Sequence, residues 1–243
     1  MSNPFFHFKQ FSIRQDKCAM KVGTDGVLLG AWVDVPFSTR WALDVGTGSG
    51  LIALMIAQRC NGQAMIEAID VDVDACNQAF ENVAESPYKD RISVVRQSFF
   101  DYSPEKKYDL IVSNPPFFKN ALPCPDEKRN TARHDDSLPL KRLIEHAVSM
   151  LSENGRIALI LPALLSDELD FIIATHRLFI RRRTEIITVE GNKPKRFLVE
   201  ITANNVQNPI PEHQTLILET KDHQRTAEYK KLLTIFVPEN FIE

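Results

Sequence analysis

The sequence predicts an α/β protein with a seven-stranded, mostly parallel sheet that includes one antiparallel strand and has helices on both faces. From Trp41 onward, short apolar runs alternate with helical patterns, which is typical of repeated β-α units. Two late β-branched runs, 180–189 and 197–202, are separated by too few residues for a crossover helix, so this pair is expected to be antiparallel. No internal repeat and no glycine- or serine-rich linker divides the chain, which indicates a single domain overall.

Apolar periodicity and local boundary signals place the individual elements. Apolar and β-branched runs predict strands at residues 41–45, 64–69, 92–96, 108–112, 155–161, 180–189 and 197–202. Amphipathic segments predict helices at residues 50–59, 74–84, 139–152, 164–175 and 226–233. Ser49 and Asp74 are the expected caps or first-turn residues of the first two helices. Two stretches with closely spaced prolines, 122–126 and 209–212, are expected to be loops.

Composition and charge exclude several classes of protein. With 243 residues, 44% of them hydrophobic, the chain is globular rather than disordered, collagenous or coiled-coil. A formal charge of −3 argues against a protein that coats nucleic acid or membrane through bulk charge. The four cysteines form no C-x-x-C pair, and no apolar run approaches the length of a membrane span. A cytoplasmic protein that makes no membrane contact is therefore expected.

A glycine-rich turn follows the first predicted strand, with glycines at positions 46, 48 and 50. Glycines permit positive φ and let backbone N–H groups approach a ligand closely. A dinucleotide fingerprint would need a glycine at position 51, which is Leu. Asp44 would repel a diphosphate but suits an ammonium, which favours S-adenosyl-L-methionine; a tight turn without a ligand is the alternative. The expected cofactor contacts here are Asp44, Gly46, Thr47 and Gly48.

An acidic residue, Asp70, ends the next predicted strand, about one β-α unit after the glycine turn. A carboxylate at this place can accept both hydrogen bonds of a ribose diol. We therefore expect Asp70, with Val71 beside it, to contact the cofactor. The alternative is that Asp70 caps the helix that follows.

The fourth predicted strand leads directly into Asn114-Pro115-Pro116-Phe117. Ligands bind at the carboxyl edge of parallel sheets, so this turn is expected to lie in the site. The prolines remove N–H donors, and the turn therefore presents two acceptors, the Asn114 side-chain oxygen and the Pro115 carbonyl. These match the two N–H groups of an exocyclic amine, and Phe117 offers a face on which a planar base can stack. A rigid surface turn with a core phenylalanine is the alternative.

Taken together, these motifs resemble those of the Rossmann-like class I methyltransferases that use S-adenosyl-L-methionine and have an Asn-Pro-Pro-aromatic turn. The amino-terminal run from Phe8 to Trp32 resembles, within that group, the bacterial family that methylates the N6 amine of an adenine in valine tRNA. The resemblance covers nearly the whole chain, including residues 131–133 and 193–196. It implies a tRNA-modifying enzyme whose target is the adenine at position 37, beside the anticodon.

The resemblance also implies roles for individual residues. The turn 114–117 is implied to be catalytic, and residues 1–40 to form an arm that packs on the cleft of a methyltransferase domain at 41–243. Many relatives have an acid after the third strand that contacts the cofactor adenine; here Ser98 or a nearby backbone carbonyl is the expected substitute, and Phe99 is the expected stacking ring. Lys21 and Thr24 lie in the family segment that folds over the cofactor. Thr24 or Asp25 is equally suited to cap a helix at 26–33.

Basic residues in the arm and in the late hairpin predict a local RNA-binding surface. Between positions 177 and 200, seven basic residues stand against three acidic ones. The expected RNA contacts are Lys9, Lys17, Arg133, Arg181, Arg182, Lys193, Lys195 and Arg196. A scattered, solvated charged face is the alternative. The H-x-D spacing at 134–136 would suit iron only with a distant His on another fold, so no metal is expected.

The expected enzyme is a monomer that binds the anticodon stem-loop of valine tRNA. Methylation of adenine or guanine in ribosomal RNA is an alternative because the chemistry is nearly the same. Methylation of a protein glutamine is another, although those relatives carry a helical domain that residues 1–40 are too short to form. A catalytically silent cofactor-binding module is a different class of protein, against which the intact turn 114–117 argues.

Overall fold

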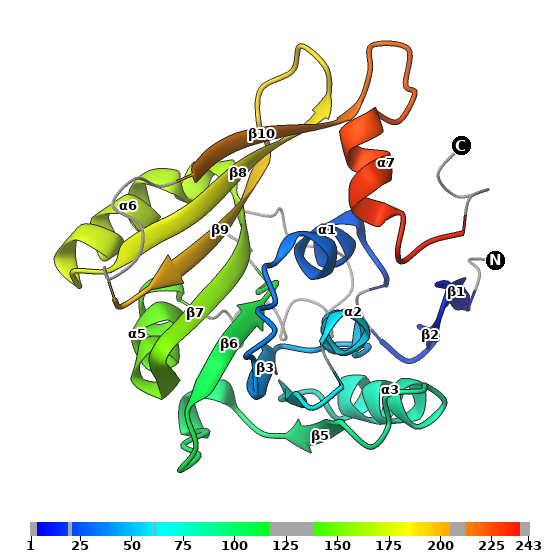
Figure 1. Cartoon of the computed structure of the whole chain (residues 1–243), viewed down its shortest axis with the longest axis vertical. Coiled ribbons are helices and arrows are strands. Elements are labelled where there is room, and N and C mark those ends of the chain that lie inside the picture. The colour runs from blue at the N-terminus through cyan, green and yellow to red at the C-terminus, as the bar shows by residue number, and fades with distance from the viewer. Residues whose placement is uncertain (1–3, 19–20, 61, 117–138, 205–211, 239–243) are drawn as a thin grey trace, which may run out of the picture.

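An eight-stranded sheet forms the centre of the computed structural model, in the order β10-β8-β9-β7-β6-β3-β4-β5 (Figure 1). The structure describes residues 4–18, 21–60, 62–116, 139–204 and 212–238. The strands of the sheet are β3 (Trp41–Val45), β4 (Met65–Asp70), β5 (Ile92–Arg96), β6 (Tyr108–Ser113), β7 (Leu151–Pro162), β8 (Phe179–Val189), β9 (Arg196–Thr202) and β10 (Glu212–Glu219). Only β9 runs against its neighbours β7 and β8, so the single antiparallel strand is confirmed.

The number of strands is a correction, because seven were expected and β10 is the eighth. It pairs in parallel with β8 from Glu212 to Glu219. Its first half is polar and exposed, and only Leu216 and Leu218 are buried. A strand with so short an apolar alternation gives little sequence signal, and it is the pairing with β8 that specifies it.

Helices cover both faces of the sheet, as expected (Figure 1). One face is covered by α1 (Thr24–Trp32), α2 (Leu51–Arg59), α3 (Val73–Ala84) and α7 (Ala227–Leu233), and the other by α5 (Leu140–Met150) and α6 (Ser166–Thr175). Each face has its own cluster of buried apolar side chains. The short 3-10 helices η1 (Phe99–Asp101) and η2 (Ala163–Leu165) follow β5 and β7. None of the helices described could cross a lipid bilayer.

The helix caps differ from those expected. Gly50 is the N-cap of α2, with φ +81°, and a Cβ added there would lie 3.4 Å from the Cβ of Ala79. Glycine is required because the chain turns left-handed where it touches α3, so Ser49 is not the cap. The N-cap of α1 is Gly23, without a side-chain hydrogen bond, and capping by Thr24 or Asp25 is therefore wrong. Asp74 lies in the first turn of α3, as expected.

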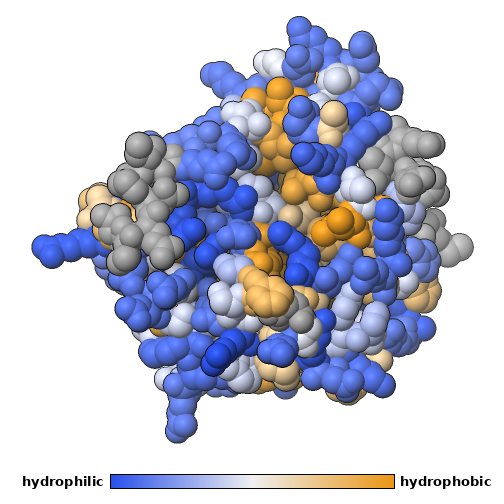
Figure 2. Space-filling view, viewed as in Figure 1, coloured by the Kyte–Doolittle hydropathy of each residue, from blue (hydrophilic) through white to orange (hydrophobic). Residues whose placement is uncertain are grey.

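The amino-terminal segment, residues 4–18, packs into the apolar cluster on the face of the sheet that α1 and α2 cover. A hairpin of β1 (Phe5–His7) and β2 (Ser12–Arg14) precedes α1, and Phe8, Phe11 and Ile13 are buried in the cluster that includes α1 and α2. Most of the face seen in Figure 1 is polar, and its apolar residues gather near the middle, around α1 (Figure 2). The segment thus contributes to the hydrophobic core as well as to the surface.

Buried amides of α3 hold this segment in place. Gln78 accepts a hydrogen bond from the backbone N–H of Lys17 at 3.0 Å. Asn82, which is 1% exposed, accepts from the N–H of Arg14 and donates to the carbonyls of Arg14 and Ser49. Since Ser49 belongs to the glycine-rich turn, one side chain connects that turn to the amino-terminal segment.

Candidate active site

The carboxyl ends of β3, β4, β5 and β6 meet at one edge of the sheet, which we call the carboxyl edge. These strands are adjacent and parallel, and Val45 is in register with Ile69 on one side and Ser113 on the other. The glycine-rich turn, the acid that ends β4 and the turn after β6 are therefore neighbours. The register brings together the three motifs that the sequence analysis singled out.

The glycine-rich turn is built to expose its backbone. Gly46 and Gly48 have φ of +69° and +57°, and a Cβ added to either would meet no heavy atom within 4 Å. The N–H groups of Gly46 and Thr47 donate to the carbonyl of Ile69, which fixes the turn against β4. Open space beside a left-handed backbone is what a closely approaching ligand needs.

Asp44 lies under this turn with no exposed surface. Its Oδ2 accepts hydrogen bonds from the Thr47 hydroxyl at 2.6 Å and from the N–H of Ala53 at 3.1 Å. Its Oδ1 is buried and has no hydrogen-bond partner among the residues described. Burial raises the pKa of Asp44 to about 7. An unpaired buried acceptor of this kind would be stabilised by a cation, which is how an ammonium group would fit the site.

Asp70 connects the glycine-rich turn to the end of β4. Its Oδ2 accepts from the N–H of Gly48 at 2.9 Å, and its Oδ1 accepts from that of Asp72 at 3.0 Å. Burial raises the pKa of Asp70 above its usual value. The cap of α3 is Asp72, which accepts from the N–H groups of Asp74 and Ala75, so the capping alternative for Asp70 is wrong. The carboxylate of Asp70 is thus held beside the turn, with Val71 exposed next to it.

The turn after β6 is anchored by a buried serine. Ser113 has no exposed surface and donates its hydroxyl to the carbonyl of Val45 at 2.8 Å. Asn114 and Pro116 follow as half-buried residues, with Pro115 buried between them. Among the described residues, none forms a hydrogen bond with the Asn114 side chain. Phe117 lies outside the described residues, as does Arg133.

The remaining expected cofactor contacts differ in how exposed they are. Ser98 is half-buried directly after β5. Phe99 is 4% exposed and packs edge-on against His146, with ring centroids 4.8 Å apart. These contacts make Phe99 a core side chain and do not support the stacking role. Lys21 is exposed, and Thr24 is the first residue of α1.

Sequence reasoning missed two residues that support the site. The hydroxyl of Ser113 links the turns after β3 and β6, and the amide of Asn82 links the glycine-rich turn to the amino-terminal segment. The only available signal was a polar residue at a position where the apolar pattern expects a buried one. Both became recognisable once their partners were known.

The basic residues do not form one surface. Lys193 and Lys195 are exposed in the turn between β8 and β9, at the carboxyl edge, where Arg196 forms an ion pair with Asp25. Lys9 donates to the carbonyl of Thr234, and Lys17 forms an ion pair with Glu81.

Arg181 and Arg182 lie at the other end of β8, which corrects the expected continuous patch. Arg182 is in register with Glu200, donates to its carboxylate at 2.9 Å and lies 3.8 Å above the ring of Trp32. It is therefore a structural residue. The reason for the error is the length of β8, which separates residues 181–182 from the turn at 190–195 by about 26 Å at ~3.3 Å per residue.

The order of the strands, the single reversed strand and the glycine-rich turn define a Rossmann-like fold of the methyltransferase type. A predicted O-methyltransferase from Agrobacterium tumefaciens has a similar structure, with a TM-score of 0.64 and 18% identity over 87% of this chain and 96% of the other. A human methyltransferase 10 domain containing protein also has a similar structure, with a TM-score of 0.57 and 19% identity over 80% and 90% of the two chains.

The chain belongs to the methyltransferase small domain family, whose sequence profile matches residues 23–168. Among its relatives, a protein of Bacteroides thetaiotaomicron is 47% identical over 232 residues, 96% of each chain. A protein of Porphyromonas gingivalis strain W83 is 44% identical over 250 aligned positions, 99% of this chain and 98% of the other. Both relatives are named tRNA1(Val) (adenine(37)-N6)-methyltransferase.

Proposed function

We propose that this protein transfers a methyl group from S-adenosyl-L-methionine to the N6 amine of adenine 37 in valine tRNA. The relatives named for that reaction match the chain from end to end at 44% to 47% identity, which supports the substrate. The chemistry depends on one observation, namely that the turn Asn114-Pro115-Pro116 is fastened through Ser113 to the strand that ends in the glycine-rich turn.

The cofactor side of the proposal uses the groups at the ends of β3 and β4. The expected contacts are Asp44, Gly46, Thr47, Gly48, Asp70 and Val71, with Ser98, Lys21 and Thr24 around them. The unpaired Oδ1 of Asp44 and the open space at Gly46 and Gly48 support this assignment. When bound, S-adenosyl-L-methionine supplies a methyl group on a positively charged sulfur, which is already a good electrophile.

On the substrate side, hydrogen bonds from the amine to the chain both orient the amine and activate it. The Asn114 side-chain oxygen and the Pro115 carbonyl accept the two N–H groups of the amine, which draws the nitrogen lone pair out of conjugation with the ring. Pro116 keeps the turn rigid, and Phe117 stacks on the base. The rate gain comes mainly from alignment, which in intramolecular reactions is worth several kcal/mol, up to ~11.

The RNA is held by basic side chains at the carboxyl edge. Lys193 and Lys195 are the proposed phosphate contacts of the β8–β9 turn, with Lys9, Lys17 and Arg133 as further contacts. The target base must leave its stack to reach the Asn114 turn, which costs least in a loop such as that of the anticodon. We assign residues 1–40 to an arm over this cleft and residues 41–243 to the methyltransferase domain, acting as a monomer in the cytoplasm.

The test is a methyl-transfer assay on unmodified tRNA. The purified protein is incubated with methyl-labelled S-adenosyl-L-methionine and with tRNA from a strain that lacks this modification, and the digested nucleosides are identified by mass spectrometry. The proposal expects N6-methyladenosine in valine tRNA, and labelling that is slower by about 100-fold or more when Asn114→Ala replaces the wild type.

Other outcomes would change specific parts of the proposal. Label in ribosomal RNA or in protein would overturn the substrate while leaving the reaction type in place. If no label appears in any of them while calorimetry shows cofactor binding, the enzyme assignment fails and a silent binding module takes its place.

A further inference from the structure

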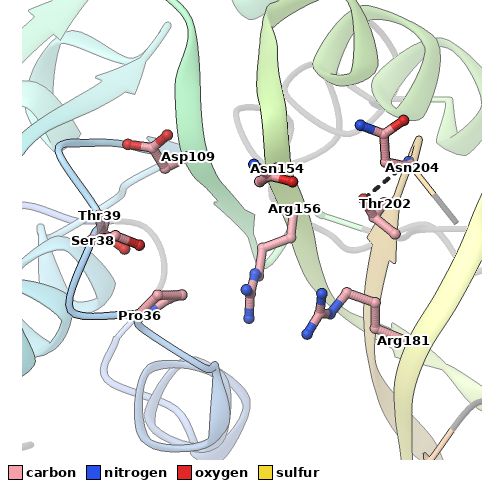
Figure 3. A pocket seen from close by; sticks show the side chains of 9 residues that line it. All are labelled: Pro36, Ser38, Thr39, Asp109, Asn154, Arg156, Arg181, Thr202 and Asn204. Atoms are coloured by element: carbon pink, nitrogen blue, oxygen red, sulfur yellow. Dashed lines mark hydrogen bonds between the residues drawn. The ribbon is translucent and has the colours of Figure 1, made fainter. Parts of the chain in front are cut away.

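A polar cavity lies at the opposite end of the strands from the candidate active site, at what we call the amino edge of the sheet. It has a volume of about 330 Å³ and is lined by the loop before β3, by the starts of β6, β7 and β8, and by the end of β9 (Figure 3). A volume of this size is within the range of small-ligand sites. None of the residues assigned to methyl transfer lines it, apart from Arg181, an expected RNA contact.

Two irregularities of strand pairing turn side chains toward this cavity. The register of β8 against β9 shifts between Ile180 and Arg182, at Arg181. The register of β6 against β7 shifts between Tyr108 and Leu110, where β7 contributes the extra residues that include Asn154. Such irregularities re-aim side chains, and they are over-represented next to active sites. Figure 3 shows the side chains of Arg156 and Arg181 both reaching into the cavity.

Hydrogen-bond donors at this cavity lack partners. The Nε atoms of Arg156 and Arg181 and the hydroxyl of Thr39 are buried without a hydrogen bond to any described residue. The Arg156 side chain is 9% exposed and Thr39 is 4% exposed, so solvent reaches them little. Each of these groups costs free energy unless a ligand or water satisfies it.

The charges of the cavity favour an anion. Arg156 forms ion pairs with Asp34 and Glu200, whereas Arg181 has no ion pair with any residue in the described part of the chain. The one acid in the lining, Asp109, already accepts hydrogen bonds from the N–H groups of Arg40 and Trp41 and from the hydroxyl of Ser152. An anion would therefore meet unsatisfied donors and the guanidinium of Arg181, while the carboxylate of Asp109 is engaged by donors of its own.

We propose that this cavity binds the phosphate group of a nucleotide, held between Arg156 and Arg181 with the Thr39 hydroxyl as a third donor. Planar guanidinium groups match phosphate oxygens in a fork geometry, which makes arginine the preferred residue for phosphate recognition. The cavity is larger than a phosphate alone requires, which leaves room for the nucleoside part of a nucleotide. The phosphate belongs either to a free mononucleotide or to the RNA backbone, and only the second source depends on the proposed function.

The first test measures binding of AMP and of inorganic phosphate to the full chain by calorimetry. Arg181→Gln removes the unpaired charge at similar size, and a loss of AMP affinity of at least about 10-fold is expected. Arg177→Gln is the matched control, because Arg177 is exposed and does not line the cavity. AMP affinity that is equal in the wild type and Arg181→Gln, or AMP that does not bind the wild type, overturns the proposal.

A second variant separates a ligand contact from a folding effect. Thr39→Val removes only the unpaired hydroxyl, and it should weaken AMP binding several-fold while the ligand-free protein unfolds at an unchanged or higher temperature. A variant that unfolds at a lower temperature without ligand and still binds AMP as the wild type does would show that the hydroxyl is structural, which contradicts its assignment as a donor.

A third measurement identifies the source of the phosphate. If it belongs to RNA, Arg181→Gln weakens tRNA binding and lowers the slope of log affinity against log salt by about 1. If it belongs to a free nucleotide, tRNA affinity is unchanged and AMP binds equally well at saturating tRNA. Neither result depends on methyl transfer, so this proposal and the proposed function can fail separately.

Discussion

At the carboxyl edge of the sheet, Asp70 accepts hydrogen bonds from the backbone N–H groups of Gly48 and Asp72; at the amino edge, Asp109 accepts from those of Arg40 and Trp41. The two carboxylates make the same kind of bond, at distances between 2.8 and 3.1 Å. Their surroundings differ, because glycines with open space beside them lie next to Asp70, whereas Asp109 lines a cavity together with two arginine side chains. The backbone contacts of an acid therefore do not identify a ligand; the neighbouring groups do.

The largest effect is expected at the carboxyl edge, in the turn after β6. Asn114→Ala should lower turnover by about 100-fold or more, because it removes an acceptor that matters most in the transition state. Affinity for S-adenosyl-L-methionine should stay near that of the wild type. Single-turnover kinetics and calorimetry measure the two quantities, with Asn77→Ala on the exposed face of α3 as the control. Wild-type turnover in Asn114→Ala would contradict the role.

The second prediction tests whether Asp70 binds a ligand in addition to holding the turn. Asp70→Ala should weaken S-adenosyl-L-methionine binding by about 10-fold or more, since hydrogen bonds to a charged group are worth ~1.5 to 3 kcal/mol. Calorimetry gives the dissociation constant. Asp74→Asn, an exposed first-turn residue of α3, is the matched control and should bind normally. Unchanged affinity in Asp70→Ala would place Asp70 in the same structural role as Asp109.

The third prediction concerns Asp109 and completes the comparison. Asp109→Ala removes the acceptor of two backbone N–H groups and of the Ser152 hydroxyl, and it should lower the free energy of unfolding by about 1 to 3 kcal/mol. Its affinity for S-adenosyl-L-methionine should equal that of the wild type. Urea unfolding and calorimetry measure the two, with Asp90→Ala as an exposed control. Weaker cofactor binding would mean that the two edges are coupled.

The smallest effect is a pH dependence that comes from Asp44. Burial raises the folded pKa of Asp44 to about 7, well above the ordinary value of an aspartate, so the folded protein binds the proton more tightly than the unfolded chain. Its contribution to stability is therefore present at low pH and is lost as pH rises through the interval between these two values. The free energy of unfolding of the wild type, measured relative to Asp44→Asn without ligand, should be larger at about pH 5 than at about pH 8. An equal difference at both values would contradict the raised pKa.

The sequence predicted most of the sheet because its strands are buried on both faces. Runs such as 41–45 and 108–112, which are apolar except for one aspartate each, are recognisable without any partner. The first half of β10 is polar and becomes a strand only through β8, so no local pattern indicated it. The same reasoning applies to the site, where strand ends placed Asp44, Asp70 and Asn114 at one edge.

Pairings between distant residues could not be predicted in this way. Asp25 and Arg196 are 171 positions apart, and nothing near Asp25 shows that it faces an arginine rather than the first turn of its own helix. Arg182 was expected at an RNA surface because it stands in a run of arginines, yet it lies over Trp32. The side chains of a run of charged residues cannot be assigned to a surface until the strand that contains them is placed in a sheet.

The hydrogen bonds of Asn82 also determine when two earlier parts of the chain can be held in place during translation. The backbone of Arg14 leaves the ribosome 68 residues before the side chain that holds it, and that of Lys17 leaves 61 residues before Gln78. The amino-terminal segment therefore lacks its hydrogen-bond partners on α3 while β3, α2 and β4 are synthesised. Its docking onto α3 and the fixing of the glycine-rich turn at Ser49 then depend on the same residue, Asn82, so the amino-terminal segment and the glycine-rich turn are completed together during translation.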